Sequence, residues 1–373
     1  MIIKKIELEN FRNYSKLTLN LNKGLTIFYG NNAQGKTNLL ESIYLLAITK
    51  SHRSSIDNNL IKIGNNIASI SGIIENNNID TKYKLVFENK NKLLMIDSNN
   101  IKKLSDFISK INVVIFYPDD LEIIKGSPQI RRRFLNIEIS QINNNYYRIL
   151  NDYNRILKMR NDYIKLIISG SNYNLDYFNV LTNYLIEKSI FLYLGRKKFI
   201  EKLNNQINKI FYNICGLNGL QISYINSFEF ESFEKKIMIE KMKKKINENY
   251  KNELKYKSTL FGPHKDDIEF YIDDLNLKNF GSQGQQKMAV LALKLSEIEL
   301  FKKVKETSPI LLLDDVFSEL DDDKKNNLLS YIDDNMQAII TTTDLHNIDK
   351  LILNKSTIIK VENGKLEIKK EVE

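Results

Sequence analysis

Hydrophobic and polar positions alternate in short runs near both ends of the chain. Residues 2–10 alternate, which predicts an edge or antiparallel strand, and apolar runs follow at 17–21 and 25–29. Further strands are predicted at 67–74, 82–88, 92–96, 112–117, 268–272, 310–313 and 337–343. A hairpin around Asn363-Gly364 closes the chain within residues 356–367. Both ends are therefore expected to build sheets.

The middle of the chain has a different period. From about 130 to 211, apolar residues recur at spacings of three and four, which is typical of helices, with a break at 170–174. Residues 235–257 form a second, strongly basic helical stretch, and shorter helices are expected at 37–48 and 282–305. We therefore predict an α/β head made of residues 1–117 and 261–373. A helical arm, residues 118–260, is inserted between them.

Charge separates the arm from the head. The 373-residue chain has a formal charge of +9, and residues 120–260 hold 24 Lys and Arg against 14 Asp and Glu. A basic segment of this kind suits a polyanion such as nucleic acid. The alternative is a coding bias that enriches lysine, although such a bias does not explain why the charge is concentrated in one segment.

Cysteine, histidine and hydropathy exclude several classes of protein. The single cysteine, Cys215, cannot form an internal disulfide, and three histidines far apart in sequence give no support to zinc. No apolar run approaches the roughly 20 residues that span a bilayer, and the start does not read as a signal peptide. A cytoplasmic protein without membrane contact is expected.

Residues 30–37, GNNAQGKT, match the phosphate-loop pattern G-x-x-x-x-G-K-[ST], between a predicted strand and a predicted helix. Backbone N–H groups of such a loop converge on phosphate oxygens, Lys36 reaches the β- and γ-phosphates, and Thr37 ligates Mg²⁺. The alternative is a glycine-rich turn that matches by chance. The expected nucleotide-binding residues are Gly30, Asn31, Asn32, Ala33, Gln34, Gly35, Lys36, Thr37 and Asn38.

An apolar run ends in two carboxylates at ILLLDD, residues 310–315. Asp314 is expected to hold Mg²⁺, which prefers oxygen ligands, and Asp315 to orient or deprotonate the attacking water. Carboxylates are common at strand ends, so this pattern is informative only together with the phosphate loop.

SQGQQ at residues 282–286 opens a predicted helix. In ATP-binding-cassette proteins, a Ser-x-Gly segment at a helix start faces the γ-phosphate bound by a second protomer, which gives Ser282 a catalytic role and Gly284 a binding role. The alternative is a polar loop in which Ser282 merely caps the helix.

Several motifs together resemble the RecF family of bacterial DNA replication and repair proteins, which are relatives of SMC heads. They run in the family's order over nearly the whole chain: ELENFRNY (7–14), GNNAQGKTN (30–38), SHR (51–53), FYPDDLEIIKGSPQIRRRFLN (116–136), YNRILKMRN (153–161), GPHKDD (262–267), GSQGQQK (281–287), LLLDDVFSELD (311–321) and ITTTD (340–344).

The resemblance implies a fold, an activity and partners. The fold is an ATP-binding-cassette, SMC-like head. The function is that of a weak, DNA-stimulated ATPase of recombinational repair, replication restart and the SOS response, with ATP and Mg²⁺ as cofactors. ATP is expected to hold two copies together on duplex DNA beside single-stranded gaps, without sequence preference. RecO and RecR are the implied partners in loading recombinase, at the nucleoid.

The resemblance also implies roles for residues outside the main motifs. Arg12 and Arg53 would lie near the nucleotide, with solvated surface arginines as the alternative. Residues 318–321 would cross to the partner protomer, and residues 341–344 stand where transporters place a histidine. Apart from the resemblance, the three arginines of residues 131–133 at the start of the arm suit either a clamp on DNA phosphates or contacts with acidic residues of the head.

Other functions are consistent with parts of the pattern. The first is an SMC-like, ATP-gated DNA tether or scaffold with negligible turnover. A transporter-type cassette subunit suits the inserted arm poorly, and a defence-associated ATPase would need an additional acidic domain for its nuclease.

Overall fold

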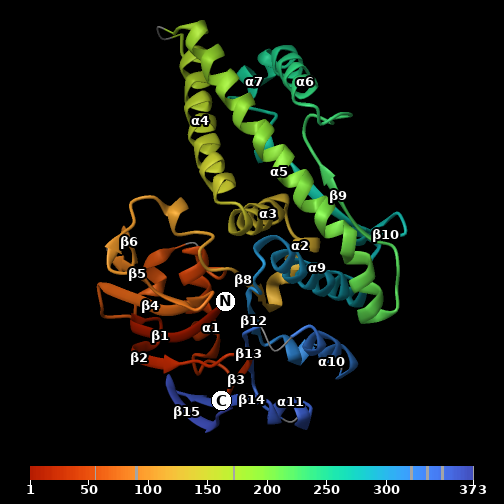
Figure 1. Cartoon of the computed structure of the whole chain (residues 1–373). Coiled ribbons are helices and arrows are strands. Elements are labelled where there is room, and N and C mark those ends of the chain that lie inside the picture. The colour runs from red at the N-terminus through yellow and green to blue at the C-terminus, as the bar shows by residue number, and fades with distance from the viewer. Residues whose placement is uncertain are drawn as a thin grey trace. The chain divides into compact units, whose positions relative to one another are not determined.

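The computed structural model describes residues 1–54, 56–88, 91–170, 173–319, 322–332, 336–345 and 348–372 (Figure 1). By internal contacts the chain forms two compact units. The first comprises Met1–Asp120, Lys209–Leu217 and Met288–Glu373, and the second comprises Leu121–Asn208 and Asn218–Lys287. Both chain ends thus belong to one unit. The second unit includes residues 261–287, which the sequence analysis assigned to the head.

The first unit contains two six-stranded sheets. Its elements are β1 (Ile2–Phe11), β2 (Tyr14–Asn20), β3 (Leu25–Tyr29), α1 (Lys36–Ile48), β4 (Ile67–Asn76), β5 (Ile79–Glu88), β6 (Asn91–Ile96), β7 (Asn99–Asn100), β8 (Val113–Phe116), β12 (Ile310–Asp314), α10 (Asp322–Ser330), β13 (Ala338–Thr342), α11 (Lys350–Asn354), β14 (Ser356–Glu362) and β15 (Lys365–Lys370). Helices α5 (Leu175–Cys215) and α9 (Gln283–Lys305) give residues to both units.

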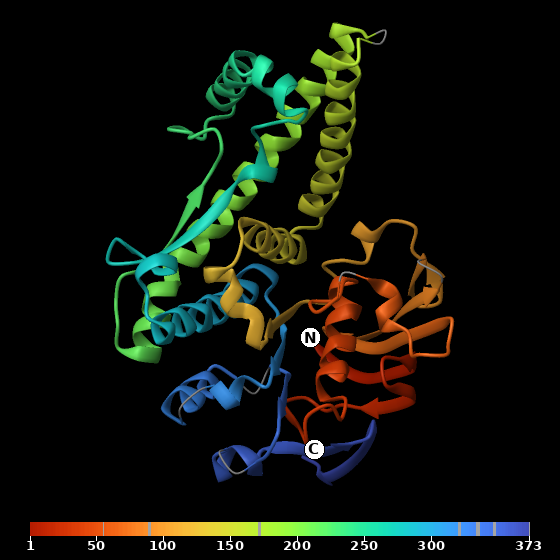
Figure 2. The ribbon, with the colours of Figure 1, turned by 180° about the vertical axis from the view of Figure 1, so that it is seen from behind.

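One sheet is antiparallel, in the order β2-β1-β4-β5-β6-β7. The other, in the order β15-β14-β3-β13-β12-β8, is parallel except for β15. Helix α1 packs against strands of both sheets, and Figure 2 shows it beside the antiparallel strands. This position explains why nearly every residue of α1 is buried, because a helix covered on both sides has no polar face.

The register of the parallel strands determines which side chains meet. Asp314 at the end of β12 lies opposite Thr341 of β13, and Thr342 lies opposite Tyr29 at the end of β3. The carboxyl ends of β3, β12 and β13 therefore meet at one edge of the sheet, where ligands of open α/β sheets bind.

The two sheets are also joined by a buried amide. The side-chain oxygen of Gln337, just before β13, accepts a hydrogen bond from the backbone N–H of Ile3 at 2.8 Å. Its amide nitrogen donates to the carbonyl oxygens of Ile3 and Asn22 at 2.9 and 3.0 Å. The N-terminal strand is thereby fastened to the C-terminal part of the chain.

The second unit is mainly helical and contains a small sheet. Its elements are α2 (Glu122–Lys125), α3 (Pro128–Ile142), α4 (Asn144–Ile168), most of α5, β9 (Leu220–Ile225), α6 (Lys235–Glu248), α7 (Tyr250–Tyr256), β10 (Asp267–Ile272), β11 (Leu275–Asn276) and α8 (Leu277–Phe280). Helices α4 and α5 lie side by side (Figures 1 and 2). The strands form a sheet in the order β11-β10-β9.

Besides its helices, this part of the chain contains a strand, β9, that the sequence analysis did not predict. Leu220 and Ile222 are buried while Gln221 is exposed, and the strand pairs with β10. The alternation was present in the sequence, but it is short and lies between long helical stretches.

A buried polar network holds this unit together. The guanidinium of Arg196 donates to a carboxylate oxygen of Asp266 at 2.8 Å and to the carbonyl oxygen of Pro263 at 2.6 Å. Asp266 also accepts from the hydroxyls of Tyr193 and Tyr224. Arg131 donates to both carboxylate oxygens of Asp267, at 2.6 and 2.7 Å. Of the two alternatives for Arg131, this pairing favours the acidic partner.

His264 gives this unit a pH-dependent stability. One ring nitrogen lies 2.5 Å from the hydroxyl of Tyr153, and the other lies 3.1 Å from the carbonyl oxygen of Thr259. Burial lowers the pKa of His264 from 6.5 to about 4, so the folded protein keeps it neutral where the unfolded chain takes up a proton. The resulting stabilisation, roughly 3 kcal/mol, is complete above pH 6.5 and is lost as the pH falls toward 4.

We expect His264→Gln to reduce the difference in urea midpoint between pH 7.5 and pH 5. Burial raises the pKa of Asp120 to about 6, an effect of opposite sign, but it is common to both proteins and cancels in the comparison. Equal pH dependence in the variant and the parent protein would contradict this account of His264.

Among the described residues, no helix is both long enough and apolar enough to cross a membrane.

Candidate functional site

The loop of residues 30–35 joins β3 to α1 and depends on backbone conformations that favour glycine. Gly30 and Gly35 have φ angles of 149° and 113°. A Cβ atom at Gly35 would lie 2.6 Å from the side-chain nitrogen of Asn13 and 2.8 Å from the hydroxyl of Tyr14, and one at Gly30 would collide with the carbonyl oxygen of Val361. Both glycines are therefore needed by the packing around the loop.

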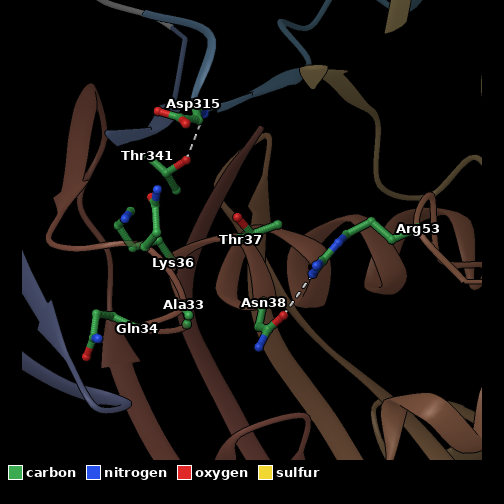
Figure 3. Close-up of a pocket in the computed structure, with 10 residues that line it drawn as sticks. Ala33, Gln34, Lys36, Thr37, Asn38, Arg53, Asp315 and Thr341 are labelled. Atoms are coloured by element: carbon green, nitrogen blue, oxygen red, sulfur yellow. Dashed lines mark hydrogen bonds between the residues drawn. The ribbon is translucent and has the colours of Figure 1, made fainter. Parts of the chain in front are cut away.

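A cavity of about 330 Å³ opens over this loop (Figure 3). Most of its lining residues are polar, and all of them belong to the first unit. The lining residues are Asn32, Ala33, Gln34, Gly35, Lys36, Thr37, Asn38, Arg53, Asp315 and Thr341. Of the predicted site residues, 32–38 and Asp315 are thus brought together at this cavity.

The ammonium group of Lys36 folds back over the loop. It donates to the carbonyl oxygen of Gly30 at 2.5 Å and to that of Asn31 at 2.9 Å. Burial lowers the pKa of Lys36, and the nearby carboxylates of Asp315 and Asp314 oppose that effect. The group is thus pre-positioned at the loop, where an anion would find a partly desolvated cation.

Asp314 accepts hydrogen bonds from two hydroxyls. The same carboxylate oxygen receives Thr37 at 2.9 Å and Thr341 at 2.7 Å, and the side chain is nearly buried. A carboxylate and hydroxyls grouped in this way are hard oxygen donors of the kind Mg²⁺ prefers.

Asp315 is placed by an unusual backbone conformation. Its φ angle is +52°, and its N–H donates to the hydroxyl and the carbonyl oxygen of Thr341 at 3.0 and 3.2 Å. The left-handed turn ends β12 and places Asp315 in the cavity lining (Figure 3). Such a conformation costs of order 1 kcal/mol or more and is found at functional sites.

Thr341 was not predicted to contact the nucleotide by itself. From the sequence, residues 341–344 were identified only as the segment that stands where transporters place a histidine. The β12–β13 register, which puts Thr341 opposite Asp314, was the missing information.

Arg12 and Arg53 both lie close to the buried carboxylate of Glu41, but of the two it is Arg53 that reaches the cavity. Arg53 lines the cavity and donates to the side-chain oxygen of Asn38 at 2.9 Å (Figure 3). Arg12 instead donates to both carboxylate oxygens of Glu41, at 2.9 and 2.8 Å. Arg12 is not among the residues that line the cavity, so any role near the nucleotide is indirect in this conformation.

Ser282 and Gly284 belong to the second unit and are not among the residues that line the cavity. The hydroxyl of Ser282 accepts from the N–H of Gln285 at 3.2 Å, and the Gln285 side chain accepts from the N–H of Ser282 at 2.9 Å. This is a capping box at the start of α9. Ser282 and Gly284 are both exposed, so the end of the helix is open to a ligand.

A second cavity, of about 430 Å³, is also lined by part of the loop and shares Gln34 with the first. Its lining is Tyr29, Gly30, Asn31, Gln34, Thr343, Asp344, Leu345, Lys360, Val361, Glu362 and Asn363. Gly30, Asn31, Thr343 and Asp344 therefore lie here, and Thr341 alone of residues 341–344 lines the first cavity. Residues 320–321, part of the predicted crossing segment, are outside the described residues.

Comparison with known proteins covers nearly the whole chain. The RecF/RecN/SMC N terminal domain family matches residues 2–367. A DNA replication and repair protein RecF from Exiguobacterium sp. (strain ATCC BAA-1283 / AT1b) is 42% identical over 370 residues, which are 98% of this chain and 99% of that protein. Its counterpart from Staphylococcus haemolyticus (strain JCSC1435) is 37% identical, over 98% of this chain and 100% of that protein.

Solved structures agree with this result. The recombination mediator protein RecF-ATP in the RecFOR pathway is similar at a TM-score of 0.91 and 33% identity, over 98% of this chain and 97% of the other. An SmcHead bound to the C-winged helix domain of ScpA has a TM-score of 0.55 at 18% identity, which concerns the fold alone. The expected fold class, an SMC-like α/β head, is confirmed.

Proposed function

The chain belongs to the RecF family of DNA replication and repair proteins, and from that membership and its cavity we propose that it is a DNA-binding ATPase of recombinational repair and replication restart. The observation that carries the proposal is the meeting of Lys36, Thr37, Asp314 and Asp315 around one loop, from segments almost 280 positions apart. The related RecF structure with ATP supports the choice of nucleotide.

The loop would hold the phosphates of ATP. Its backbone N–H groups and the N-terminal end of α1 present partial positive charge, and the Lys36 ammonium adds a full one. Lys36 exchanges its bonds to Gly30 and Asn31 for phosphate oxygens at little cost, because it already lies over the loop. Arg53 in the cavity lining would add a second cation, and the side-chain amide of Asn38 would add a hydrogen bond.

The residues present suit Mg²⁺. Thr37 and Asp314 would hold the ion, which when bound neutralises phosphate charge. One carboxylate and one hydroxyl suffice for such a site, because the nucleotide supplies further oxygens. Thr341, which also donates to Asp314, would fix the rotamer of that carboxylate.

Asp315 would orient and deprotonate the water that attacks the γ-phosphate. Its left-handed backbone holds the carboxylate in the cavity lining rather than along the strand. A general base of this kind contributes about 10²–10⁴-fold to a rate.

The site would be completed by a second copy of the chain. Ser282 and Gly284 lie exposed at the open N-terminal end of α9, a helix of 23 residues that can stabilise an anion. Supplied by a partner protomer, Ser282 would donate to the γ-phosphate bound by Lys36. Dimerisation would then depend on ATP, and hydrolysis would release the dimer.

Duplex DNA beside a single-stranded gap is the proposed substrate. The basic excess of residues 120–260 falls mostly in the second unit, whose exposed lysines suit phosphate contacts without sequence preference. RecO and RecR are the proposed partners, because the related structures belong to a RecFOR pathway. This substrate implies a location at the nucleoid.

ATP turnover measured against protein concentration tests the composite site. The rate per molecule should rise with concentration and with duplex DNA, because both favour the dimer, and DNA stimulation should fall steeply with salt. A rate that is independent of concentration and DNA would overturn the composite site and leave a monomeric nucleotide switch.

A further inference from the structure

Glu41 is a buried carboxylate on α1, one turn beyond the phosphate loop. We propose that Glu41 is a positioning residue of the nucleotide site, which holds Arg53 in the lining of the cavity. The inference rests on the proposed ATP site and adds a residue that does not itself touch the cavity.

Glu41 pairs with Arg12 through both oxygens of its carboxylate. Both carboxylate oxygens accept from the Arg12 guanidinium, whose remaining nitrogen donates to the carbonyl oxygen of Asn59 at 2.8 Å. Although burial opposes ionisation, hydrogen bonds from Arg12 and Ser51 outweigh it and hold the pKa of Glu41 below its usual value. Glu41 is therefore charged, and its charge is balanced mainly by Arg12.

Fixing Arg12 fixes the residues that follow it. The hydroxyl of Tyr14 donates to the carbonyl oxygen of Gly35 at 3.1 Å, and the side-chain nitrogen of Asn13 donates to the carbonyl oxygen of Gln34 at 3.3 Å. Asn13 also accepts from the side chain of Asn38 at 2.9 Å. The turn of residues 11–14 thus makes hydrogen bonds to the phosphate loop, and Arg12 holds the turn in place.

On its other side Glu41 organises the loop that carries Arg53. The hydroxyl of Ser51 donates to Glu41 at 2.5 Å and accepts the backbone N–H groups of Arg53 and Ser54 at 3.0 and 2.9 Å. The Arg53 guanidinium lies 3.7 Å from a Glu41 oxygen.

Two guanidinium groups therefore share one carboxylate. Arg12 occupies both oxygens at hydrogen-bond distance, while Arg53 is held loosely and remains partly exposed. Two positive charges face one negative charge, so one net positive charge remains. It resides mainly on Arg53, which lines the cavity. This arrangement orients Arg53 toward the cavity without neutralising it, which is what a phosphate contact needs.

The competing explanation is that Glu41 acts only through Arg12, by holding the turn of residues 11–14 against the phosphate loop. In that case the loss of Glu41 would disturb the phosphate loop whether or not Arg53 is present. If Glu41 acts through Arg53, its loss should matter only while Arg53 is there. A double-mutant cycle separates the two cases.

The test measures the Kd of a fluorescent ATP analogue for the full chain, Glu41→Gln, Arg53→Gln and the double variant. We expect each single change to weaken binding about tenfold and the double variant to be within about twofold of Arg53→Gln. Glu75→Gln, which removes the ion pair of Glu75 with Lys4, is the matched control and should leave Kd unchanged. Thermal midpoints check that each variant folds.

Ser51→Ala is a milder variant in case Glu41→Gln does not fold. It leaves the Arg12–Glu41 pair intact but releases the loop of Arg53, so ATP binding should weaken several-fold with little change in the thermal midpoint. Unchanged affinity in both variants, or an equal loss from Glu41→Gln with and without Arg53, would overturn the positioning role. Failure of the parent protein to bind ATP would instead overturn the proposed function, and this inference with it.

Discussion

Replacing Lys36 by alanine is expected to weaken ATP binding by at least about 100-fold. The ammonium is held against the phosphate loop by two hydrogen bonds that it donates to carbonyl oxygens of that loop, and charge-assisted contacts contribute roughly 1.5–3 kcal/mol each. Because Lys36 is already partly desolvated, the phosphates gain its charge without further cost. Titration with a fluorescent ATP analogue, and the shift of the thermal midpoint with added ATP, measure the effect.

Lys16→Ala is the control for the loss of one positive charge. Lys16 is exposed on β2 of the same unit and does not line the cavity, so its removal should leave ATP affinity unchanged. If Lys36→Ala folds and binds ATP within about threefold of the parent protein, the cavity is not the nucleotide site.

Much of the fold could be predicted because its signals are local. The alternation of residues 2–10, the apolar run of β12 and the glycines of the phosphate loop each specify an element without reference to the rest of the chain. The order of the motifs then required one sheet built from both chain ends, and the structure has it: β3 lies beside β13 and β14.

The remaining features depend on contacts that sequence spacing does not specify. Thr341 meets Asp314 only through the register of two parallel strands, and Glu41 appears in the sequence as one more residue of an apolar helix. Arg12 was expected near the nucleotide, but its bidentate partner could be known only when α1 was placed beside the turn that follows β1. The assignments of site residues to ATP and Mg²⁺ stay predictions.

Replacing Asp315 by asparagine is expected to lower ATP turnover by at least about 100-fold and to change ATP affinity by less than about threefold. Asparagine keeps the size of the side chain and tolerates the left-handed backbone at this position, so the N–H bonds to Thr341 should persist. What is lost is a carboxylate able to take a proton from water, which contributes about 10²–10⁴-fold. Steady-state turnover and equilibrium ATP binding, measured on the same preparation, separate the two effects.

Asp314→Asn is the matched comparison, because it changes the neighbouring carboxylate, which accepts from Thr37 and Thr341. It should weaken Mg²⁺-dependent ATP binding, whereas Asp315→Asn should not. Turnover at the parental rate in Asp315→Asn would show that another group activates the water.

Asp315→Asn also distinguishes the two functions considered for this chain, a repair ATPase that needs hydrolysis and an ATP-gated DNA tether that does not. If cells that carry Asp315→Asn lose turnover but keep DNA repair, ATP acts as the gate of a tether and hydrolysis is dispensable. If repair fails while the variant still dimerises on DNA with ATP, release of the dimer by hydrolysis is the required step.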